Sequence, residues 1–229
     1  MLNLFIAGTD TNVGKTYIST GMLSAFNEAG FSTIACKPVA SGCMVHNDKL
    51  YNADALALQA ACSVKLHYDY INPFAFAAPI APHIAAQHAG RELSVELLQQ
   101  KCRTVLSYPA DICLIEGAGG WYTPLNHHET LADFVVRMQF YVVLVVGMRL
   151  GCLNHSILTS QALQQAGIKV AGWIANCIEP ELPALEENLA SLKARLPFPC
   201  LGVVQHNARI ADSIDIKKLT FLHDRCVAG

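Results

Sequence analysis

The stretch 8–16 reads GTDTNVGKT and directly follows the apolar run 2–7, LNLFIA. Its ending, Gly-Lys-Thr, is typical of a phosphate-binding loop, in which backbone N–H groups, a lysine and a hydroxyl hold phosphates and Mg²⁺. The common loop has four residues between its two glycines, whereas five separate Gly8 from Gly14. A strand, a glycine turn and a helix in this order predict a nucleotide site at one edge of a parallel sheet.

Apolar runs alternate with helical patterns along the rest of the chain. Because strands that alternate with helices form right-handed βαβ units, the sequence predicts an α/β fold with a mostly parallel sheet and helices on both faces. We expect strands at 2–7, 32–37, 110–117, 140–147, 170–177 and 199–204. We expect helices at 14–28, 52–61, 94–107, 154–166 and 183–196, and a Pro- and Ala-rich loop at 70–82 that leads into another helix.

Composition limits the class of protein. The 229 residues suit a single domain, 1–229, and 52% hydrophobic against 15% charged residues suits a sheet buried on both faces. A net charge of −2 disfavours nucleic acid and anionic membranes as partners. The longest apolar run, 140–148, is too short to span a bilayer, and no signal peptide is visible. Nine cysteines without a Cys-x-x-Cys pair favour buried thiols in a reducing, cytoplasmic compartment.

The residues themselves suggest phosphate chemistry. Lys15 would reach the β- and γ-phosphates and Thr16 would hold Mg²⁺. Glu116 ends the expected strand 110–117, at the edge where such sheets bind ligands, and could supply a carboxylate for the metal. Asp54 is a second candidate, although it could equally be a solvated acid in the first turn of a helix.

Other polar residues are less decisive on their own. Lys37, at the end of the strand 32–37, is either an anion clamp or a solvated lysine. Ser41 lies in a turn and is most simply a turn hydroxyl. Asn154 is a reasonable helix cap. The histidines at 127, 128 and 155 lack metal-binding spacing, so we expect structural roles for them.

Four stretches together resemble the dethiobiotin synthetase family. They are GTDTNVGKT (8–16), KPVASG (37–42), EGAGGWYTPL (116–125) and RLGCLNHSILT (149–159). The spacing of five residues between the loop glycines is that family's own version. The stretches NADALAL (52–58), NPFAFAAPIAPHIAA (72–86) and AGWIAN (171–176) extend the resemblance, which covers most of the chain to about residue 202.

The resemblance implies a P-loop NTPase fold and an ATP-dependent ring closure in biotin synthesis. CO₂ adds to one amine of 7,8-diaminononanoate as a carbamate, and ATP phosphorylates this carbamate to a carbamic–phosphoric anhydride. The second amine attacks the anhydride, which releases phosphate and closes the cyclic urea of dethiobiotin. The family is homodimeric, with the active site at the interface, and it uses Mg²⁺.

Carried over residue by residue, the resemblance implies four sets of site residues. Lys37, Lys15 and Thr11 would be catalytic, and Thr16, Asp54 and Glu116 would hold Mg²⁺. The nucleotide would contact Asn12, Val13, Gly14, Lys15, Thr16, Tyr17, Asp54, Glu116, Gly117, Ala118, Gly119, Asn176, Cys177, Gln205, His206, Asn207 and Asp212. The substrate would contact Thr11, Lys37 and Ser41, with Gly151, Cys152, Leu153 and Asn154 of the partner subunit binding its distal carboxylate.

The chain also departs from the family pattern. Asn12 stands where a member of the family has Glu, and Arg149 where it has Lys. Gln205 replaces the proline of a Gly-x-Ile-Pro motif near the base pocket, which puts the base contacts in question. The alternative reading is a regulatory ATPase of the partitioning or division-site type. Those proteins carry a lysine where this chain has Asp10, so the sequence favours the synthetase.

Overall fold

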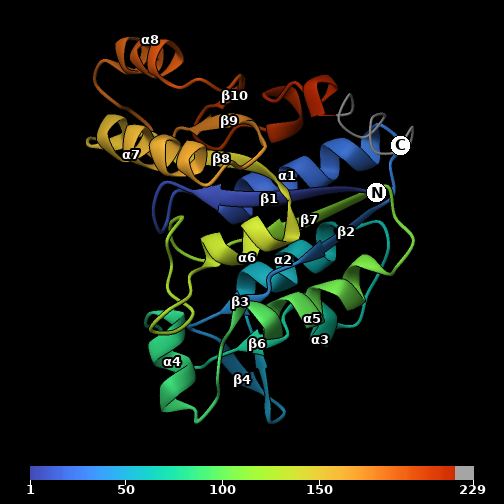
Figure 1. Ribbon diagram of the computed structural model, residues 1–229. Coiled ribbons are helices and arrows are strands. Elements are labelled where there is room, and N and C mark those ends of the chain that lie inside the picture. The colour runs from blue at the N-terminus through green and yellow to red at the C-terminus, as the bar shows by residue number, and fades with distance from the viewer. Residues whose placement is uncertain (220–229) are drawn as a thin grey trace.

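A six-stranded parallel sheet forms the centre of the molecule. The computed structural model describes residues 1–219, and the sheet order is β10-β9-β8-β1-β7-β2 (Figure 1). All of its strand pairs are parallel, which confirms the predicted fold class. The strands are β1 (Leu2–Gly8), β2 (Thr33–Cys36), β7 (Ile112–Glu116), β8 (Tyr141–Gly147), β9 (Val170–Asn176) and β10 (Cys200–Val204).

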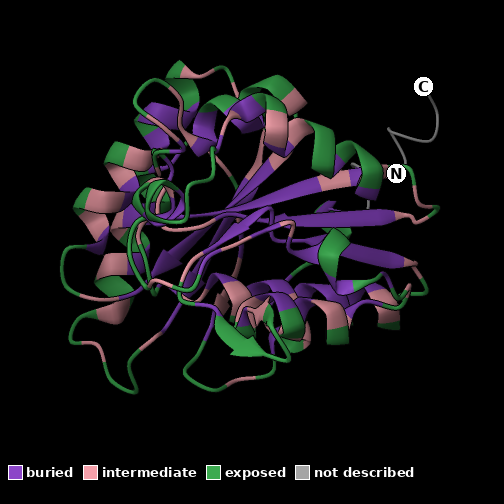
Figure 2. Cartoon of the chain, turned by 90° about the horizontal axis from the view of Figure 1, so that it is seen from below, coloured by how far each residue is buried: buried purple, intermediate pink, exposed green. Residues whose placement is uncertain are grey.

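Helices cover both faces of this sheet, and alternation along β1 shows why. Leu2, Leu4 and Ile6 pack with α1 on one face, whereas Phe5 and Ala7 join the core on the other. Figure 2 shows the strands buried between helices whose outer surfaces are exposed. The first face is covered by α1 (Lys15–Glu28), to which α2 (Ala53–Ala61) adds part of its apolar surface. The second is covered by α5 (Val95–Leu106), α6 (Leu131–Met138), α7 (Cys152–Gln165) and α8 (Leu185–Arg195).

Smaller elements complete the end of the molecule beside β2. A short parallel pair joins β3 (Val39–Ala40) to β6 (Phe74–Ala75), and an antiparallel hairpin joins β4 (Met44–His46) to β5 (Lys49–Tyr51). The hairpin turns at Asn47 and Asp48, which both have positive φ, as two-residue hairpin loops require. The remaining elements are α3 (Tyr68–Ile71), α4 (Pro82–His88) and the 3₁₀ turn η1 (Ile210–Asp212).

The boundaries agree with the sequence with a few exceptions. The expected loop at 70–82 does lead into a helix, α4, with Pro82 at its first position. The helix expected at 154–166 begins instead at Cys152 with Gly151 as its N-cap, so the prediction of Asn154 as a cap is wrong. Gly151 has a φ of 93° and no side chain to accommodate, which lets the chain enter the helix two residues earlier.

The described cysteines are free thiols, and all except Cys200 are buried. They fill the core as small apolar residues, as the sequence predicts. Within residues 1–219, none of the helices combines the length and the apolar character needed to cross a membrane. The predicted domain boundary at residue 229 lies outside the described residues.

Candidate active site

Three neighbouring strands bring the predicted phosphate chemistry to one edge of the sheet. β1, β7 and β2 lie side by side and run in the same direction, so their carboxyl ends meet. The loop 8–16 follows β1, Lys37 follows β2 directly, and Glu116 is the last residue of β7. The fold therefore gathers residues that are about a hundred positions apart in the chain.

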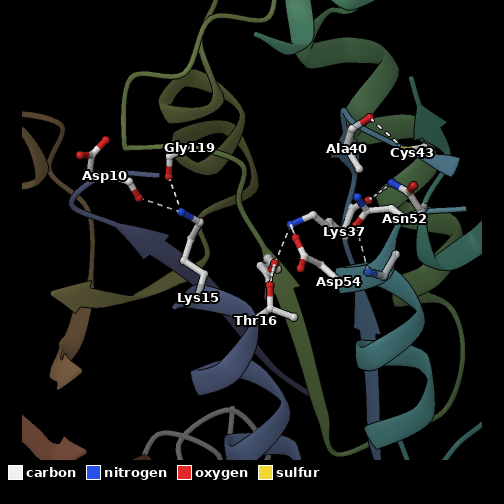
Figure 3. Close-up of polar contacts among 12 residues, drawn as sticks. Asp10, Lys15, Thr16, Lys37, Ala40, Cys43, Asn52, Asp54 and Gly119 are labelled. Carbon is white, nitrogen blue, oxygen red and sulfur yellow. Dashed lines mark hydrogen bonds and ion pairs between the residues drawn. The ribbon is translucent and has the colours of Figure 1, made fainter. Parts of the chain in front are cut away.

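The loop after β1 wraps the start of α1. Gly14 has a φ of 85° and forms the N-cap of the helix, a conformation that glycine adopts without strain. The Lys15 Nζ donates hydrogen bonds to the carbonyl oxygens of Gly119, at 2.6 Å, and of Asp10, at 3.0 Å (Figure 3). Both acceptors are backbone groups, so the ammonium lies over the loop, and none of the carboxylates in residues 1–219 is in direct contact with it.

Burial makes the Lys15 charge costly. The pKa of Lys15 is lowered from 10.5 to about 8, first because the side chain is buried and second because Lys37 is close. A bound anion would compensate the charge that the protein leaves only partly balanced here. This favours phosphate as the ligand of the loop.

A buried carboxylate, Glu116, lies at the centre of the site. Its Oε1 accepts a hydrogen bond from the Thr16 hydroxyl, at 2.8 Å. The same oxygen forms an ion pair with the Lys37 Nζ, at 2.6 Å. Lys37 also reaches the Asp54 Oδ2, at 3.1 Å (Figure 3). Burial alone would lower the pKa of Lys37, but Glu116 and Asp54 outweigh it and raise that pKa.

The same residues fit a divalent cation. Glu116 is wholly inaccessible to solvent, yet its second oxygen, Oε2, has no hydrogen-bond partner among the described residues. An unpaired carboxylate oxygen in the interior is expensive unless something binds it. Two carboxylates and a hydroxyl are hard oxygen ligands of the kind that Mg²⁺ prefers, together with phosphate oxygens. The structure thus offers a chemically suitable place for Mg²⁺.

A cavity of about 1000 Å³ opens above these residues. Its size leaves room for more than the phosphates of a nucleotide. The predicted site residues that line it are Thr11, Asn12, Gly14, Lys15, Thr16, Lys37, Ser41, Asp54, Glu116, Ala118 and Gly119. The lining residues that the sequence did not single out as ligands are Ala40, Asn52, Pro79, Ile80, Ala81, Pro82, Gly120, Thr123 and Pro124.

Two of those additional residues have recognisable structural roles. The Asn52 side chain caps α2 by accepting from the Ala55 N–H, and this cap places Asp54 in the first turn. The Thr123 hydroxyl donates to the carbonyls of Ala118, at 2.7 Å, and Gly120, at 3.0 Å, which holds the glycine turn that Lys15 contacts. The cap was visible in the sequence, whereas no local pattern indicated the role of Thr123.

A second group of predicted residues lies beside the loop and outside the cavity. Asn176, at the end of β9, donates from Nδ2 to the Val13 carbonyl, at 2.9 Å, and so braces the loop from below. The Cys177 N–H donates to the Val204 carbonyl, at 2.8 Å. Gly117 is buried against β1, where an added Cβ would lie 3.2 Å from the Ile6 carbonyl oxygen.

The residues predicted for the base follow β10. Gln205, His206 and Asn207 are exposed, and Asp212 pairs with Arg209 at 3.2 Å. The Tyr17 hydroxyl donates to the Ala208 carbonyl, so the turn 205–207 lies next to the start of α1.

The start of α7 lies outside the cavity of its own chain. Gly151 and Asn154 are exposed, Leu153 is partly buried and Cys152 is buried. Arg149, just before this helix, forms an ion pair with Asp10 of the phosphate loop. The segment is therefore tied to the loop without contributing to this cavity from within the same chain.

Comparison with known proteins agrees with this arrangement. A protein-family model described as "AAA domain" matches residues 2–213. A protein of Pseudomonas aeruginosa (strain UCBPP-PA14) named "ATP-dependent dethiobiotin synthetase BioD" is 50% identical over 220 residues, 94% of this chain and 96% of that protein. A protein of the same name from Cellvibrio japonicus (strain Ueda107) is 52% identical over 200 residues, 87% of each chain.

Solved structures show the same fold at much lower identity. The MinC:MinD cell division protein complex of Aquifex aeolicus matches with a TM-score of 0.56 at 13% identity, over 93% of this chain and 84% of that one. The cell division protein FtsY of Thermotoga maritima matches with a TM-score of 0.53 at 14% identity, over 97% and 68%. Likeness at this level concerns the fold alone. The sequence relatives are decisive, and the chain belongs to the dethiobiotin synthetase family.

Proposed function

We propose that the protein is an ATP-dependent dethiobiotin synthetase, which forms dethiobiotin from 7,8-diaminononanoate, CO₂ and ATP in biotin biosynthesis. One observation carries the proposal: two buried lysines, Lys15 and Lys37, flank a buried carboxylate in a single cavity. A phosphate-binding loop itself supplies one lysine for the phosphates, here Lys15. The second lysine, Lys37, would stabilise the negative charge of a carbamate that becomes phosphorylated.

In the proposed reaction, a carbamate oxygen attacks the γ-phosphorus of ATP, and the bond from that phosphorus to the ADP oxygen breaks. Lys15 and the N–H groups of the loop 11–17 would stabilise the negative charge of the phosphates in the transition state of the transfer. The free amine then attacks the carbamate carbon, the ring closes, and the carbon–oxygen bond breaks to release phosphate. Thr11 and Ser41, which line the cavity, would orient the diamine so that the second amine is near the anhydride.

Mg²⁺ is part of the proposal, and Thr16, Asp54 and Glu116 are the residues that would hold it. When bound, it would neutralise charge on the β- and γ-phosphates. Lys37 now pairs with two of these three residues. With Mg²⁺ held by those oxygens, Lys37 would be free to pair with the carbamate, whose negative charge would replace that of the carboxylates.

The remaining assignments are also proposals. Asn176, Cys177, Gln205, His206, Asn207 and Asp212 would form the base side of the nucleotide site, since they lie beside α1 and the loop. We also propose a homodimer in which Gly151, Cys152, Leu153 and Asn154 serve the partner's site. Their absence from the lining of the cavity in the same chain supports this, together with Leu150, which is 98% exposed. Free buried cysteines support a cytoplasmic location, and we propose one domain for residues 1–229.

The test is product formation by the purified protein. With 7,8-diaminononanoate, bicarbonate, Mg²⁺ and ATP, we expect dethiobiotin by mass spectrometry and phosphate release that requires the diamine. Release of phosphate at the same rate with and without the diamine would contradict the proposed function.

A further inference from the structure

The segment that follows the turn 205–207 is packed against α1 at a glycine. Ile210 of η1 is buried and faces Gly21 in the middle of α1. A Cβ added to Gly21 would lie 2.3 Å from the Cβ of Ile210 and 2.4 Å from its Cδ1. Figure 1 shows this segment, in orange-red, beside α1. Ile210 therefore occupies the space that any side chain at position 21 would need.

Two polar contacts flank this packing. The Tyr17 hydroxyl, one helical turn before Gly21, donates to the Ala208 carbonyl. Arg209 forms an ion pair with Glu28 at the end of α1, at 2.5 Å. Both charged side chains of that pair are largely exposed, and such pairs contribute little. The contact between Gly21 and Ile210, together with the Tyr17 hydroxyl, thus holds the segment on α1. A bridge between Ile214 and Gly202 holds its far end on β10.

These anchors determine where the turn 205–207 lies. On one side, the Val204 carbonyl is fixed by the Cys177 N–H, next to the residue that braces the phosphate loop. On the other side, Ala208 is fixed on α1. The turn therefore spans two supports, one on β9 and one on α1, and it belongs to the base side of the nucleotide site proposed above.

We propose that Gly21 is a positioning residue for the recognition of the nucleotide base. Because it lacks a side chain, Ile210 can approach α1, and this approach sets the turn 205–207 against the base. The inference rests on the proposed nucleotide site, and it concerns the base end alone, with no effect on the phosphate loop.

The test compares ATP with inorganic tripolyphosphate, which has the phosphates and lacks the base. In Gly21→Ala, the methyl group must displace Ile210 and with it the turn. We expect the Kd for ATP, measured by calorimetry with Mg²⁺, to rise roughly three- to tenfold, as for one lost neutral hydrogen bond. The Kd for tripolyphosphate stays unchanged. Gln100→Ala, at an exposed position of α5 on the other face of the sheet, is the control and leaves both constants unchanged.

A size exchange distinguishes positioning from general damage. The double variant Gly21→Ala with Ile210→Gly removes the clash, and we expect it to recover most of the affinity for ATP. Tyr17→Phe removes the hydrogen bond from the Tyr17 hydroxyl to the Ala208 carbonyl without adding bulk. It therefore tests the positioning of the turn even if Gly21→Ala does not fold. We expect Tyr17→Phe to raise the Kd for ATP and to leave the Kd for tripolyphosphate unchanged.

Three results would overturn the inference. The first is an equal loss of affinity for ATP and for tripolyphosphate in the variants. The second is an unchanged affinity for ATP in both Gly21→Ala and Tyr17→Phe. The third is a wild-type protein that binds tripolyphosphate as tightly as ATP. If ATP is preferred as expected and no dethiobiotin forms, the proposed function fails and the inference stands. The two ideas are therefore separable.

Discussion

At the residue scale, the protonation state of Lys15 makes ATP binding depend on pH. Its pKa is lowered to about 8 by burial and by Lys37, so in the free protein the ammonium loses its proton as the pH rises through about 8. Bound phosphates favour the charged form and raise the pKa again. Binding of ATP at about pH 8.5 must therefore take up protons, whereas at about pH 6.5 Lys15 is already charged and takes up none.

This uptake is measurable by calorimetry in two buffers that differ in their heat of ionisation. We expect a buffer-dependent binding heat at the higher pH that grows as pH passes through about 8, with loss of affinity in the same range. Lys15→Arg provides the control, since its guanidinium keeps the positive charge and stays protonated throughout this range. A binding heat that depends equally on the buffer in wild type and in this variant would contradict the assignment.

Lys37 gives a second prediction at this scale. In Lys37→Gln, the amide can still donate a hydrogen bond to Glu116, but the charge that the carbamate needs is gone. We expect turnover to fall by at least about a hundredfold, as for loss of a group that stabilises developing charge, with the Kd for ATP changed little. Steady-state kinetics and ATP calorimetry measure the two effects. A loss of ATP affinity as large as that of Lys15→Ala would instead place Lys37 on the nucleotide.

Asp54 tests the metal assignment. Its side chain is 46% exposed, so Asp54→Asn should change the free energy of unfolding by less than about 1 kcal/mol. We expect the Mg²⁺ concentration for half-maximal ATP binding to rise severalfold, because one oxygen ligand loses its charge. Asp69→Asn, at an exposed acid of α3, is the matched control. If Asp54→Asn needs the same Mg²⁺ concentration as the wild type, Asp54 is not a ligand of the metal.

At the scale of elements, the loop 8–16 and α1 are joined at Gly14. A Cβ there would lie 2.1 Å from the Asn176 Nδ2 and would be strained by the φ of 85°. Gly167 has a φ of 64°, and no atom of the described part of the chain lies within 4 Å of an added Cβ, so it isolates the strain alone. We expect Gly167→Ala to cost about 1–2 kcal/mol of stability, and Gly14→Ala to cost more because the clash with Asn176 adds to the strain. Only Gly14→Ala should lose ATP binding; equal binding in the two variants would show that the clash with Asn176 is harmless.

The same scale shows what the sequence could and could not predict. The six strands of the sheet were predictable because they are buried on both faces and read as long apolar runs. The hairpin of β4 and β5 was not, since its strands have three residues each and are mostly exposed. Helix α6 was also missed, although the capping box of Thr130 and Asp133 was a usable signal.

The candidate site was predictable to a similar extent. The order of strands in the sheet brings Lys15, Lys37 and Glu116 together, and motifs at three strand ends were enough to indicate them. The pairing of Lys37 with Glu116 and Asp54 was not predictable, because it depends on side-chain positions. The packing of Ile210 on Gly21 joins segments that carry no shared pattern.

At the scale of the whole molecule, the proposed dimer makes each site depend on both subunits. Lys37→Gln and Asn154→Ala would each inactivate both sites of their own homodimer. In a mixed dimer, one site would combine intact Lys37 from one subunit with intact Asn154 from the other. Random mixing after subunit exchange should restore about a quarter of the wild-type activity. If each chain forms its own complete site, mixing restores nothing.

The central claim is that a carbamate is phosphorylated, and one measurement tests it most directly. In that reaction the carbamate oxygen that attacks ATP leaves with the phosphate when the ring closes. We therefore supply CO₂ labelled with heavy oxygen in unlabelled water and analyse the products of a single turnover by mass spectrometry. The account predicts one labelled oxygen in the phosphate for each dethiobiotin formed. Unlabelled phosphate alongside dethiobiotin would contradict it, since the phosphate oxygen would then come from water.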